Sequence, residues 1–378
     1  MQITNMEQCV GCAICEASCP NKAIQMKYMT EFGGFQYPYI DEDKCVLCRK
    51  CVSICTANKQ VEMYTPFEYE IAQTNNIDDL NTATSGGVAT SLVKNFIQKN
   101  NGIVYGAAFD NNMRVRHIRC ATLEECDRLK GSKYVQSDMT SIHSSIQSDL
   151  NNNRNVLFIG TPCQCAAMVA FRDCSNFYMC DLVCNGVGSP EVFYKHLQYI
   201  EQKYKGNVTN YVFRPKTSHY LEPYEVAVLN NATSVKLISP WEKWGTLYYN
   251  SLVMRKSCYS CKYTSENRVG DICLSDIPEQ LLNNCKLKAD VKRYGATYIS
   301  INTTKGITLA TLIHEQCSTE KVDRVQKMRM KEPIPRSPQR DNFLMLCQER
   351  SLEKAKLRVF GAKTKIKGIF IKLKNNLS

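Results

Sequence analysis

Two cysteine runs near the N-terminus restrict the possible folds of this 378-residue chain more than any other feature. The first run is CVGCAICEASCP, from Cys9 to Pro20, and the second is CVLCRKCVSIC, from Cys45 to Cys55. Both runs have the spacing C-x₂-C-x₂-C-x₃-C, and Cys45 follows Cys9 by 36 positions. A related segment follows each run, NKAIQM after the first and NKQVEM after the second, so one small unit occurs twice.

This spacing is typical of proteins that bind two [4Fe-4S] clusters. Three cysteines of one run surround three corners of a cubane, and the fourth cysteine ligates the cubane of the other run. The first cluster is therefore predicted to bind Cys9, Cys12, Cys15 and Cys55, and the second to bind Cys45, Cys48, Cys51 and Cys19. Zinc is the alternative, but zinc sites favour two separated C-x₂-C pairs over triplets. Thr56 stands where a second proline would match Pro20, a change that removes no ligand.

The rest of the composition agrees with a metalloprotein of the cytoplasm. The chain starts with neither the basic nor the apolar segment of a secretory signal, so we expect its thiols to stay reduced. Twenty-one cysteines then indicate metal ligation rather than a disulfide framework. The longest apolar run, residues 159–171, is far shorter than the roughly 20 residues that span a bilayer, while 44% hydrophobic residues are enough for a buried core.

Beyond the cysteine runs, predicted strands alternate with predicted helices. Strands are expected at residues 103–109, 156–160 and 177–184, and helices are expected to begin near Val88, Thr122, Pro162 and Pro190. This order predicts a mixed α/β domain after an α+β ferredoxin-like domain. The expected boundaries are 1–66 for the ferredoxin domain, 67–87 for a polar linker, 88–332 for the α/β domain and 333–378 for a basic C-terminal tail.

Six motifs in the second domain resemble the coenzyme F-420 hydrogenase/dehydrogenase beta-subunit family. They are SGGVATSLV (85–93), VYGAAFD (104–110), LKGSKYVQSDM (129–139), GTPCQ (160–164), DLVCNGVGSP (181–190) and SCYSCKYTSENRVGDI (257–272). The resemblance covers about residues 84–310 and implies a flavoprotein domain that binds FAD beside an iron–sulfur cluster. Where relatives carry aromatic residues, this chain has LSDIPEQLLNN (274–284), which points to a different substrate if that stretch shapes the substrate side of the flavin.

The resemblance also implies a set of cofactor contacts and a third cluster. The expected FAD contacts are Ser85, Gly86, Gly87, Gly131, Lys133 and Tyr134. The first three open a helix, whose free amides and positive end suit a pyrophosphate, although glycine at a helix start is common. The second three have a solvated turn as their alternative. The expected ligands of the third cluster are Cys163, Cys184, Cys258 and Cys261, with a zinc site or small buried hydrophobic residues as alternatives.

The predicted function is an iron–sulfur flavoprotein oxidoreductase. It would pass electrons between [4Fe-4S] clusters and a flavin that exchanges hydride with a soluble carrier or small-molecule substrate. The alternative is an electron-transfer subunit that serves a separate partner enzyme and has no substrate of its own. In either case we expect a partner such as ferredoxin or another oxidoreductase, and no nucleic acid. No catalytic residue is assigned, because none of the five histidines clusters with a nucleophile motif.

Most of the excess positive charge lies in the C-terminal tail. Residues 349–378 contain nine Lys or Arg and two Glu, a net charge of +7 out of +12 for the chain. Apolar residues alternate with these lysines, a pattern that is compatible with contact with an anionic membrane surface or an acidic partner, although such tails are most commonly loosely ordered and solvated. Gly361 and Gly368 are expected to interrupt any helix, and a loosely ordered solvated end is the alternative.

Overall fold

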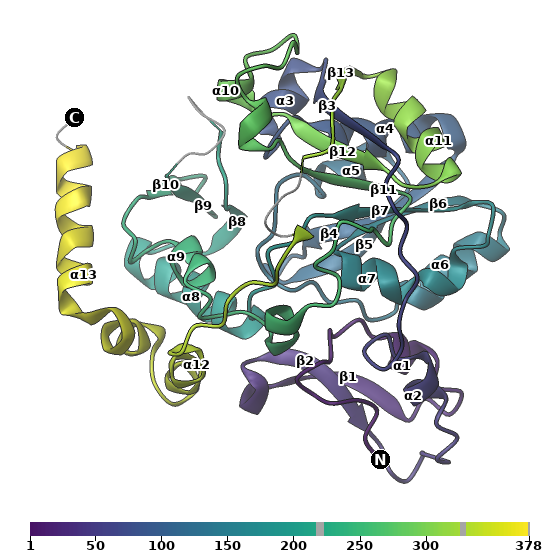
Figure 1. Ribbon diagram of the computed structural model, residues 1–378. Helices are drawn as coiled ribbons and strands as arrows, with labels where there is room; N and C mark the ends of the chain where they lie inside the picture. The colour runs from purple at the N-terminus through teal and green to yellow at the C-terminus, as the bar shows by residue number, and fades with distance from the viewer. Residues whose placement is uncertain (217–222, 326–329, 377–378) are drawn as a thin grey trace.

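The computed structural model describes residues 1–216, 223–325 and 330–376, with a small N-terminal domain below a larger α/β body (Figure 1). Residues 217–222 and 326–329 of the expected α/β domain and residues 377–378 of the expected tail lie outside the described part. Among the described residues, no helix combines the length and the hydrophobicity that crossing a membrane requires.

The N-terminal domain contains one hairpin and two short helices. Strands β1 (Ile24–Met29) and β2 (Phe35–Ile40) are antiparallel, with Ile24 opposite Ile40. A 3₁₀ turn at Thr30–Phe32 joins them. Helix α1 (Ile14–Ala17) begins in the first cysteine run and α2 (Lys50–Ile54) in the second, and the two helices contact each other. This α+β arrangement agrees with the expected ferredoxin-like domain.

The α/β body is built on an eight-stranded mixed sheet. In spatial order its strands are β13 (Cys317–Lys321), β3 (Glu68–Thr74), β12 (Thr297–Ile301), β11 (Ile272–Asp276), β7 (Phe177–Leu182), β6 (Asn155–Gly160), β4 (Gly102–Phe109) and β5 (Val115–Cys120). The four strands β4, β6, β7 and β11 are parallel to their neighbours within this group, and every other pairing is antiparallel. The mixed α/β class is therefore the predicted one.

Helices cover both faces of this sheet because successive strand residues point to opposite sides. Val156 and Phe158 of β6 pack into one apolar cluster, while Leu157 packs into another. The second cluster lies under α4 (Val88–Asn100), α5 (Leu123–Asp127) and α11 (Thr304–His314). The first cluster lies under α6 (Ile142–Asn151), α7 (Pro162–Ala167) and the 3₁₀ turn Val169–Phe171.

The N-terminal domain belongs to the same core as the sheet. Ile14 and Cys15 of the cysteine-binding unit lie in one continuous apolar cluster with Ile142 and Phe158 of the α/β body. Hydrogen bonds add to this packing: the Ser189 hydroxyl donates to the carbonyl of Gly33 at 2.6 Å. The two domains therefore form a single packed unit.

A second, three-stranded sheet was not predicted from the sequence. It consists of β10 (Ser234–Leu237), β9 (Glu225–Leu229) and β8 (Val208–Val212), all antiparallel. Its core is aromatic and includes Phe193 and Trp244, whose rings meet edge to face at 5.1 Å. Helices α8 (Pro190–Tyr204) and α9 (Trp244–Tyr249) contribute these two rings.

Several local predictions are confirmed. The predicted strands at residues 103–109, 156–160 and 177–184 correspond to β4, β6 and β7. The helix expected to begin near Thr122 is α5, and a capping box at this residue starts it. The helix expected to begin near Pro190 is α8, and Ser189 caps it by accepting a hydrogen bond from the amide of Val192 at 3.2 Å.

Residues 67–87, expected to be a polar linker, instead contain β3 and the short helix α3 (Ile77–Thr82). β3 lies inside the sheet between β12 and β13. The sequence does not show β3 as an apolar pattern, because the strand contains polar residues that are buried together with their hydrogen-bond partners. Glu70 contacts the Nε2 atom of His314 at 2.7 Å, and the Gln73 amide donates to the carbonyl of Gly295 at 2.6 Å.

Part of the expected C-terminal tail is packed against the body. Helix α12 (Arg340–Glu349) and the beginning of α13 (Leu352–Asn376) bury Phe343 and Ala355 in the aromatic core. Gly361 interrupts α13 with φ 73° and ψ 164°, as expected, whereas Gly368 lies within the helix. The remaining short elements are α10 (Val291–Tyr294) and the 3₁₀ turns Lys256–Ser260 and Glu279–Leu281.

Candidate functional site

The two cysteine runs wrap around their centres with the same backbone path. Positive φ angles occur at Gly11 (68°) and Ala13 (60°) in the first run and at Leu47 (55°) and Arg49 (59°) in the second. These positions are 36 residues apart, like the cysteines. A non-glycine residue in the left-handed region costs free energy and persists where the surrounding structure requires it. The repeated conformation is the one that turns successive cysteine side chains toward a common centre.

The structure groups the eight N-terminal cysteines as the spacing predicts. Burial and the nearby thiols of Cys9 and Cys55 together raise the pKa of Cys12 to about 12. Burial and the thiols of Cys12, Cys9 and Cys55 likewise raise the pKa of Cys15. We call Cys9, Cys12, Cys15 and Cys55 set one. The second group lines a small cavity together with Pro20 and Ile24, and we call its four cysteines set two: Cys19, Cys45, Cys48 and Cys51.

Four cysteines from distant parts of the chain form a third group. We call Cys163, Cys184, Cys258 and Cys261 set three, and all four line one cavity, which we call the cysteine cavity. Cys163 lies in the first turn of α7, Cys184 follows β7, and the other two lie in and just after the turn Lys256–Ser260. The thiols of this set influence one another. Burial is the main cause that raises the pKa of Cys163 to about 12, and the nearby thiol of Cys261 is the second cause.

Buried thiols with raised pKa values are neutral at pH 7 unless a metal replaces the proton. Metal ligation deprotonates cysteine, so the four-thiol sets fit an iron cluster chemically. Within the described ranges, no group of three or more His, Cys, Asp or Glu side chains is arranged to hold a single metal ion. A cubane has a different requirement, because each of its four thiolates binds a separate iron.

Set one and set three follow one another toward a larger cavity. The thiol of Cys163 in set three also raises the pKa of Cys12 in set one, so these two sets are neighbours. Val10, inside the first cysteine run, lines the cysteine cavity. On the other side, residues 184–187 line both the cysteine cavity and the larger cavity. Set three therefore lies between set one and the larger cavity.

The larger cavity has a volume of about 330 Å³, which is in the range of cofactor sites. It lies at the carboxyl ends of β6, β7 and β11, where Gly160, Cys184 and Asp276 form part of its wall. Ligands of open α/β sheets bind in this position. Five of the six expected FAD contacts line the cavity: Ser85, Gly87, Gly131, Lys133 and Tyr134.

Gly86 is the exception, and its role is steric. A Cβ atom at Gly86 would lie 2.5 Å from the carbonyl oxygen of Ala72 and 2.7 Å from the amide nitrogen of Thr297. The residue therefore packs against β3 and β12 rather than facing the cavity. Gly87, with φ 75°, is the residue before α4, so the free amides at the start of this helix reach the cavity wall.

The terminal amino group of Lys133 is hydrogen-bonded to the backbone of the protein. Its ammonium group donates hydrogen bonds to the carbonyls of Arg128, Leu129 and Lys130 at 3.3, 2.9 and 2.8 Å. Burial lowers the pKa of Lys133 to about 7. The side chain thus holds the turn that carries Gly131, and its stem is the part that can contact a ligand.

Two polar residues in the wall were missed by sequence reasoning. Arg214 donates to Asp276 at 2.7 Å, while its Nε and Nη2 atoms are buried without a partner among the described residues. His117 approaches the carbonyl of Ile159 with Nε2 (3.1 Å) and the hydroxyl of Ser137 with Nδ1 (2.9 Å). Burial lowers the pKa of His117 to about 4, so the ring is neutral at pH 7. Neither residue lies in a motif that marks a site.

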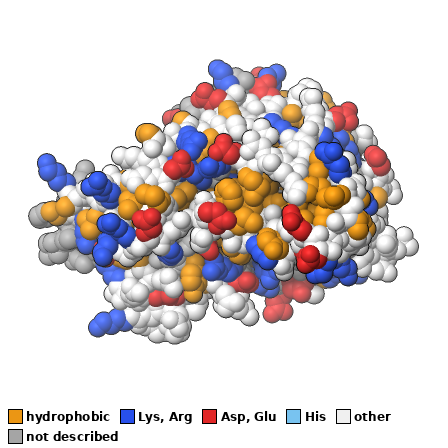
Figure 2. All heavy atoms as spheres, turned by 90° about the horizontal axis from the view of Figure 1, so that it is seen from below, with side chains coloured by type: hydrophobic (Ala, Val, Ile, Leu, Met, Phe, Trp, Pro, Cys, Tyr) orange, Lys and Arg blue, Asp and Glu red, His pale blue; other side chains and the backbone are white. Residues whose placement is uncertain are grey.

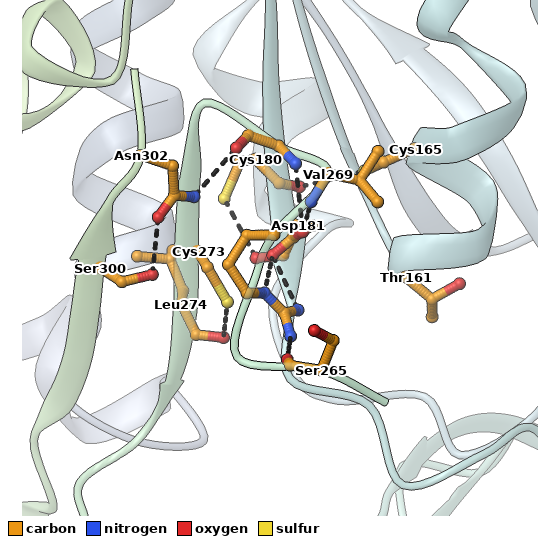
Figure 3. A network of polar contacts seen from close by, with 12 residues as sticks. Thr161, Cys165, Cys180, Asp181, Ser265, Val269, Cys273, Leu274, Ser300 and Asn302 are labelled. Atoms are coloured by element: carbon orange, nitrogen blue, oxygen red, sulfur yellow. Dashed lines mark hydrogen bonds and ion pairs between the residues drawn. The ribbon is translucent and has the colours of Figure 1, made fainter. Parts of the chain in front are cut away.

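A buried ion pair supports the wall of the cysteine cavity (Figure 3). Asp181, at the end of β7, accepts hydrogen bonds from Arg268 and from the amides of Val269 and Gly270 at 2.9 to 3.1 Å. Arg268 lines the cysteine cavity and also pairs by its backbone with Tyr64, just before β3. The pair therefore fixes the segment after Cys261 against the sheet.

Comparison with known proteins gives two family matches. Residues 8–59 match the family described as 4Fe-4S dicluster domain. Residues 153–327 match the family described as the C terminus of the beta subunit of coenzyme F420 hydrogenase/dehydrogenase. No curated protein matches the chain. A solved structure of the F420-reducing [NiFe] hydrogenase complex from Methanosarcina barkeri, derivatized with xenon, is 16% identical, covers 81% of this chain and 96% of its own, and has a TM-score of 0.46.

Proposed function

This chain belongs to the coenzyme F420 hydrogenase/dehydrogenase beta-subunit family and carries an N-terminal 4Fe-4S dicluster domain, and from this premise we propose that it is an iron–sulfur flavoprotein oxidoreductase. Electrons would enter or leave through set two and would be exchanged at a flavin in the larger cavity. The alternative is an electron-transfer subunit without a substrate of its own. The observation that favours the flavoprotein is the wall that residues 184–187 share between the cysteine cavity and the larger cavity.

The residues around the larger cavity fit a dinucleotide. A flavin, when bound, exchanges hydride as a pair and releases electrons singly to iron–sulfur clusters. The amides at the start of α4 and the Arg214 guanidinium can bind the pyrophosphate. Tyr134 and Tyr248, whose rings stack at 4.7 Å, supply aromatic surface to the same wall.

The test of this function is the cofactor content of the protein purified without oxygen. We expect about twelve irons, about twelve sulfides and one FAD per chain, and bleaching of the flavin absorbance by a two-electron donor. Iron and sulfide without flavin, even after addition of FAD, would favour the electron-transfer subunit. Zinc in place of iron would refute both functions.

Arg214 is expected to decide the affinity for FAD. Its buried Nε and Nη2 atoms, which have no partner among residues 1–216, 223–325 and 330–376, can donate charge-assisted hydrogen bonds, each worth about 1.5 to 3 kcal/mol. Arg214→Ala should therefore weaken FAD binding by about tenfold to a hundredfold, measured by titrating the flavin-free protein with FAD. Arg154→Ala is the control, because this guanidinium binds Asn101 at the opposite end of β6. Equal affinity for the Arg214→Ala variant and the unchanged protein would contradict the assignment.

The partner is proposed to dock where set two reaches the surface. Val46 and Leu47 lie between Cys45 and the exposed Cys48 of set two, with 64% and 65% of their surface accessible. Figure 2 shows hydrophobic side chains among scattered charges on this lower face of the molecule. Leu47 has a positive φ at the position that Gly11 occupies in the first run, so this backbone conformation does not require the leucine side chain. Exposed apolar side chains at such a place favour a protein contact.

The proposed partner is an electron-carrier protein with an acidic rim. Arg49 and Lys50 lie near the Val46–Leu47 tip and form no ion pair within the described residues, whereas Lys44 pairs with Asp41. Complementary charges raise the association rate and make it sensitive to salt. Association with a reduced acidic ferredoxin should therefore weaken as ionic strength rises.

The substitution Leu47→Gly should change the affinity for the partner without a large change in the stability of the fold. We expect the stability to change by less than about 1 kcal/mol, because relief of the left-handed strain offsets the greater freedom of glycine in the unfolded chain. The affinity for the reduced acidic ferredoxin should fall at least about fivefold, since an interface side chain of this size is lost. Stopped-flow measurement of cluster bleaching gives this affinity. The control is Ile307→Ala, because Ile307 is an exposed side chain of α11. Unchanged affinity would place the docking site elsewhere.

Contact of the C-terminal tail with a membrane surface stays a prediction.

A further inference from the structure

We propose that Arg255 supplies a positive charge shared by the clusters of set one and set three and raises the reduction potentials of both. The proposal rests on the proposed function, because it requires clusters in these two sets. Arg255 is a positioning residue in this role: it acts on the ligands and on the electrostatic potential around them.

The contacts of Arg255 place its guanidinium against set one. Its Nη2 atom donates to the sulfur of Cys9 at 3.4 Å, and its Nε atom donates to the Cys9 carbonyl at 2.6 Å. Nη2 also donates to the carbonyl of Gln36 at 3.0 Å, and Nη1 donates to the side chain of Gln136 at 2.8 Å. Hydrogen bonds to ligand sulfur are one of the features that set the potential of an iron–sulfur cluster.

The same guanidinium borders set three. Arg255 lines the cysteine cavity and precedes the turn that carries Cys258. The amide of Cys258 donates a hydrogen bond to the carbonyl of Arg255 at 3.0 Å, which holds the two residues together. One cation therefore lies beside thiols of two different sets.

Arg255 differs from the other arginine in the cysteine cavity in how its charge is balanced. Arg268 forms an ion pair with Asp181 at 2.9 Å. Arg255 is only 1% exposed, and its partners in the described part of the chain are two carbonyls, an amide, a thiol and the rings of Tyr37 and Phe35, 4.1 and 5.4 Å away. A buried cation without a counter-ion is strongly unfavourable. Thiolate-ligated clusters on both sides would provide the missing negative charge.

The fold makes room for this arrangement at one glycine. A Cβ atom at Gly11 would lie 2.8 Å from Nη1 of Arg255 and 2.5 Å from Nε2 of Gln136. Gln136 in turn donates to the carbonyl of Val10 at 2.9 Å. The first cysteine run is thus shaped so that a guanidinium can lie directly against it.

A fixed positive charge favours the form of a cluster that carries one more electron. Each cluster becomes more negative by one charge when it is reduced, and attraction to Arg255 stabilises that state. Set two has no contact with Arg255 among the described residues. Its cluster is therefore an internal reference within the same molecule.

The experiment is a redox titration of the anaerobic full-length protein followed by electron paramagnetic resonance. In Arg255→Gln, the reduction equilibrium of two clusters should shift at least tenfold toward the oxidised form, or about 59 mV for one electron. The third cluster should keep its potential. Arg255→Lys keeps a charge and should recover most of the shift. Arg154→Gln, at the far end of β6, should change none of the three potentials.

Each outcome decides the question. Unchanged potentials in an Arg255→Gln variant that retains its iron would overturn the proposal and leave the proposed function intact. Loss of iron in both Arg255→Gln and Arg255→Lys would also overturn it, because the contacts and not the charge would then matter. Loss in Arg255→Gln with retention in Arg255→Lys would support it. A wild-type protein without iron would instead refute the proposed function.

Discussion

Replacing Cys258 and Cys261 together by alanine should lower the iron content from about twelve to about eight per chain. Both thiols belong to set three, and a cubane cannot be held by the two that remain, Cys163 and Cys184. Because set three lies between set one and the larger cavity, electrons supplied to set two should no longer reach a flavin. The flavin should then be reduced only by a direct two-electron donor. Iron and sulfide analysis and flavin bleaching by a reduced ferredoxin measure the two effects.

The matched control is the double variant Cys317→Ala, Cys347→Ala. These two thiols are also buried, in β13 and α12, and they line neither the cysteine cavity nor the larger cavity. The control removes the same number of sulfur atoms, so it should keep about twelve irons and normal flavin reduction. An iron content of about twelve in the Cys258, Cys261 variant would show that set three does not ligate a cluster.

Asp181→Ala should lower the free energy of unfolding by about 3 to 5 kcal/mol. The change leaves Arg268 as an unpaired charge that is 2% exposed, and it removes the acceptor of two backbone amides. Figure 3 shows Val269 beside the Asp181 carboxylate. Urea unfolding without oxygen, followed by circular dichroism, measures the loss. Because Arg268 borders the cysteine cavity, iron bound by set three should also be released at lower urea.

Glu353→Ala is the control for this prediction. Its partner is Lys365, and both side chains are 40% exposed. Exposed ion pairs contribute about 0 to 1 kcal/mol, so this variant should unfold almost like the unchanged protein. Equal stability of the two variants would mean that the environment of Asp181 is more solvated than the structure shows.

The features that the sequence could predict are local ones. Cysteine spacing depends on a few consecutive residues, and the structure places all eight N-terminal cysteines in the two expected groups. The mixed α/β class followed from strands such as β4 and β6, which are continuous apolar runs. The thiols of set three come from three separate segments, so only the family resemblance related them before the structure was known.

The features that could not be predicted depend on contacts between distant residues. Arg255 meets Cys9 across 246 positions, and no pattern around either residue signals the contact. Arg214 meets Asp276 across 62 positions in the same way. β3 was overlooked because its buried Glu70 and Gln73 find partners on other elements. In each case the decisive interaction forms only when the sheet is complete.

The shared core of the two domains has a consequence for turnover. Ile14 packs in one cluster with Phe158, and β3 joins the large sheet soon after Cys55, the last cysteine of the second run. The iron-binding domain is therefore fixed against the α/β body and is not attached to it by a flexible linker. This domain should not move between distant sites. Under the proposed function, a carrier protein would have to reach the Val46–Leu47 tip by diffusion, so the concentration of this carrier, and not an internal hinge, should govern how often electrons are delivered.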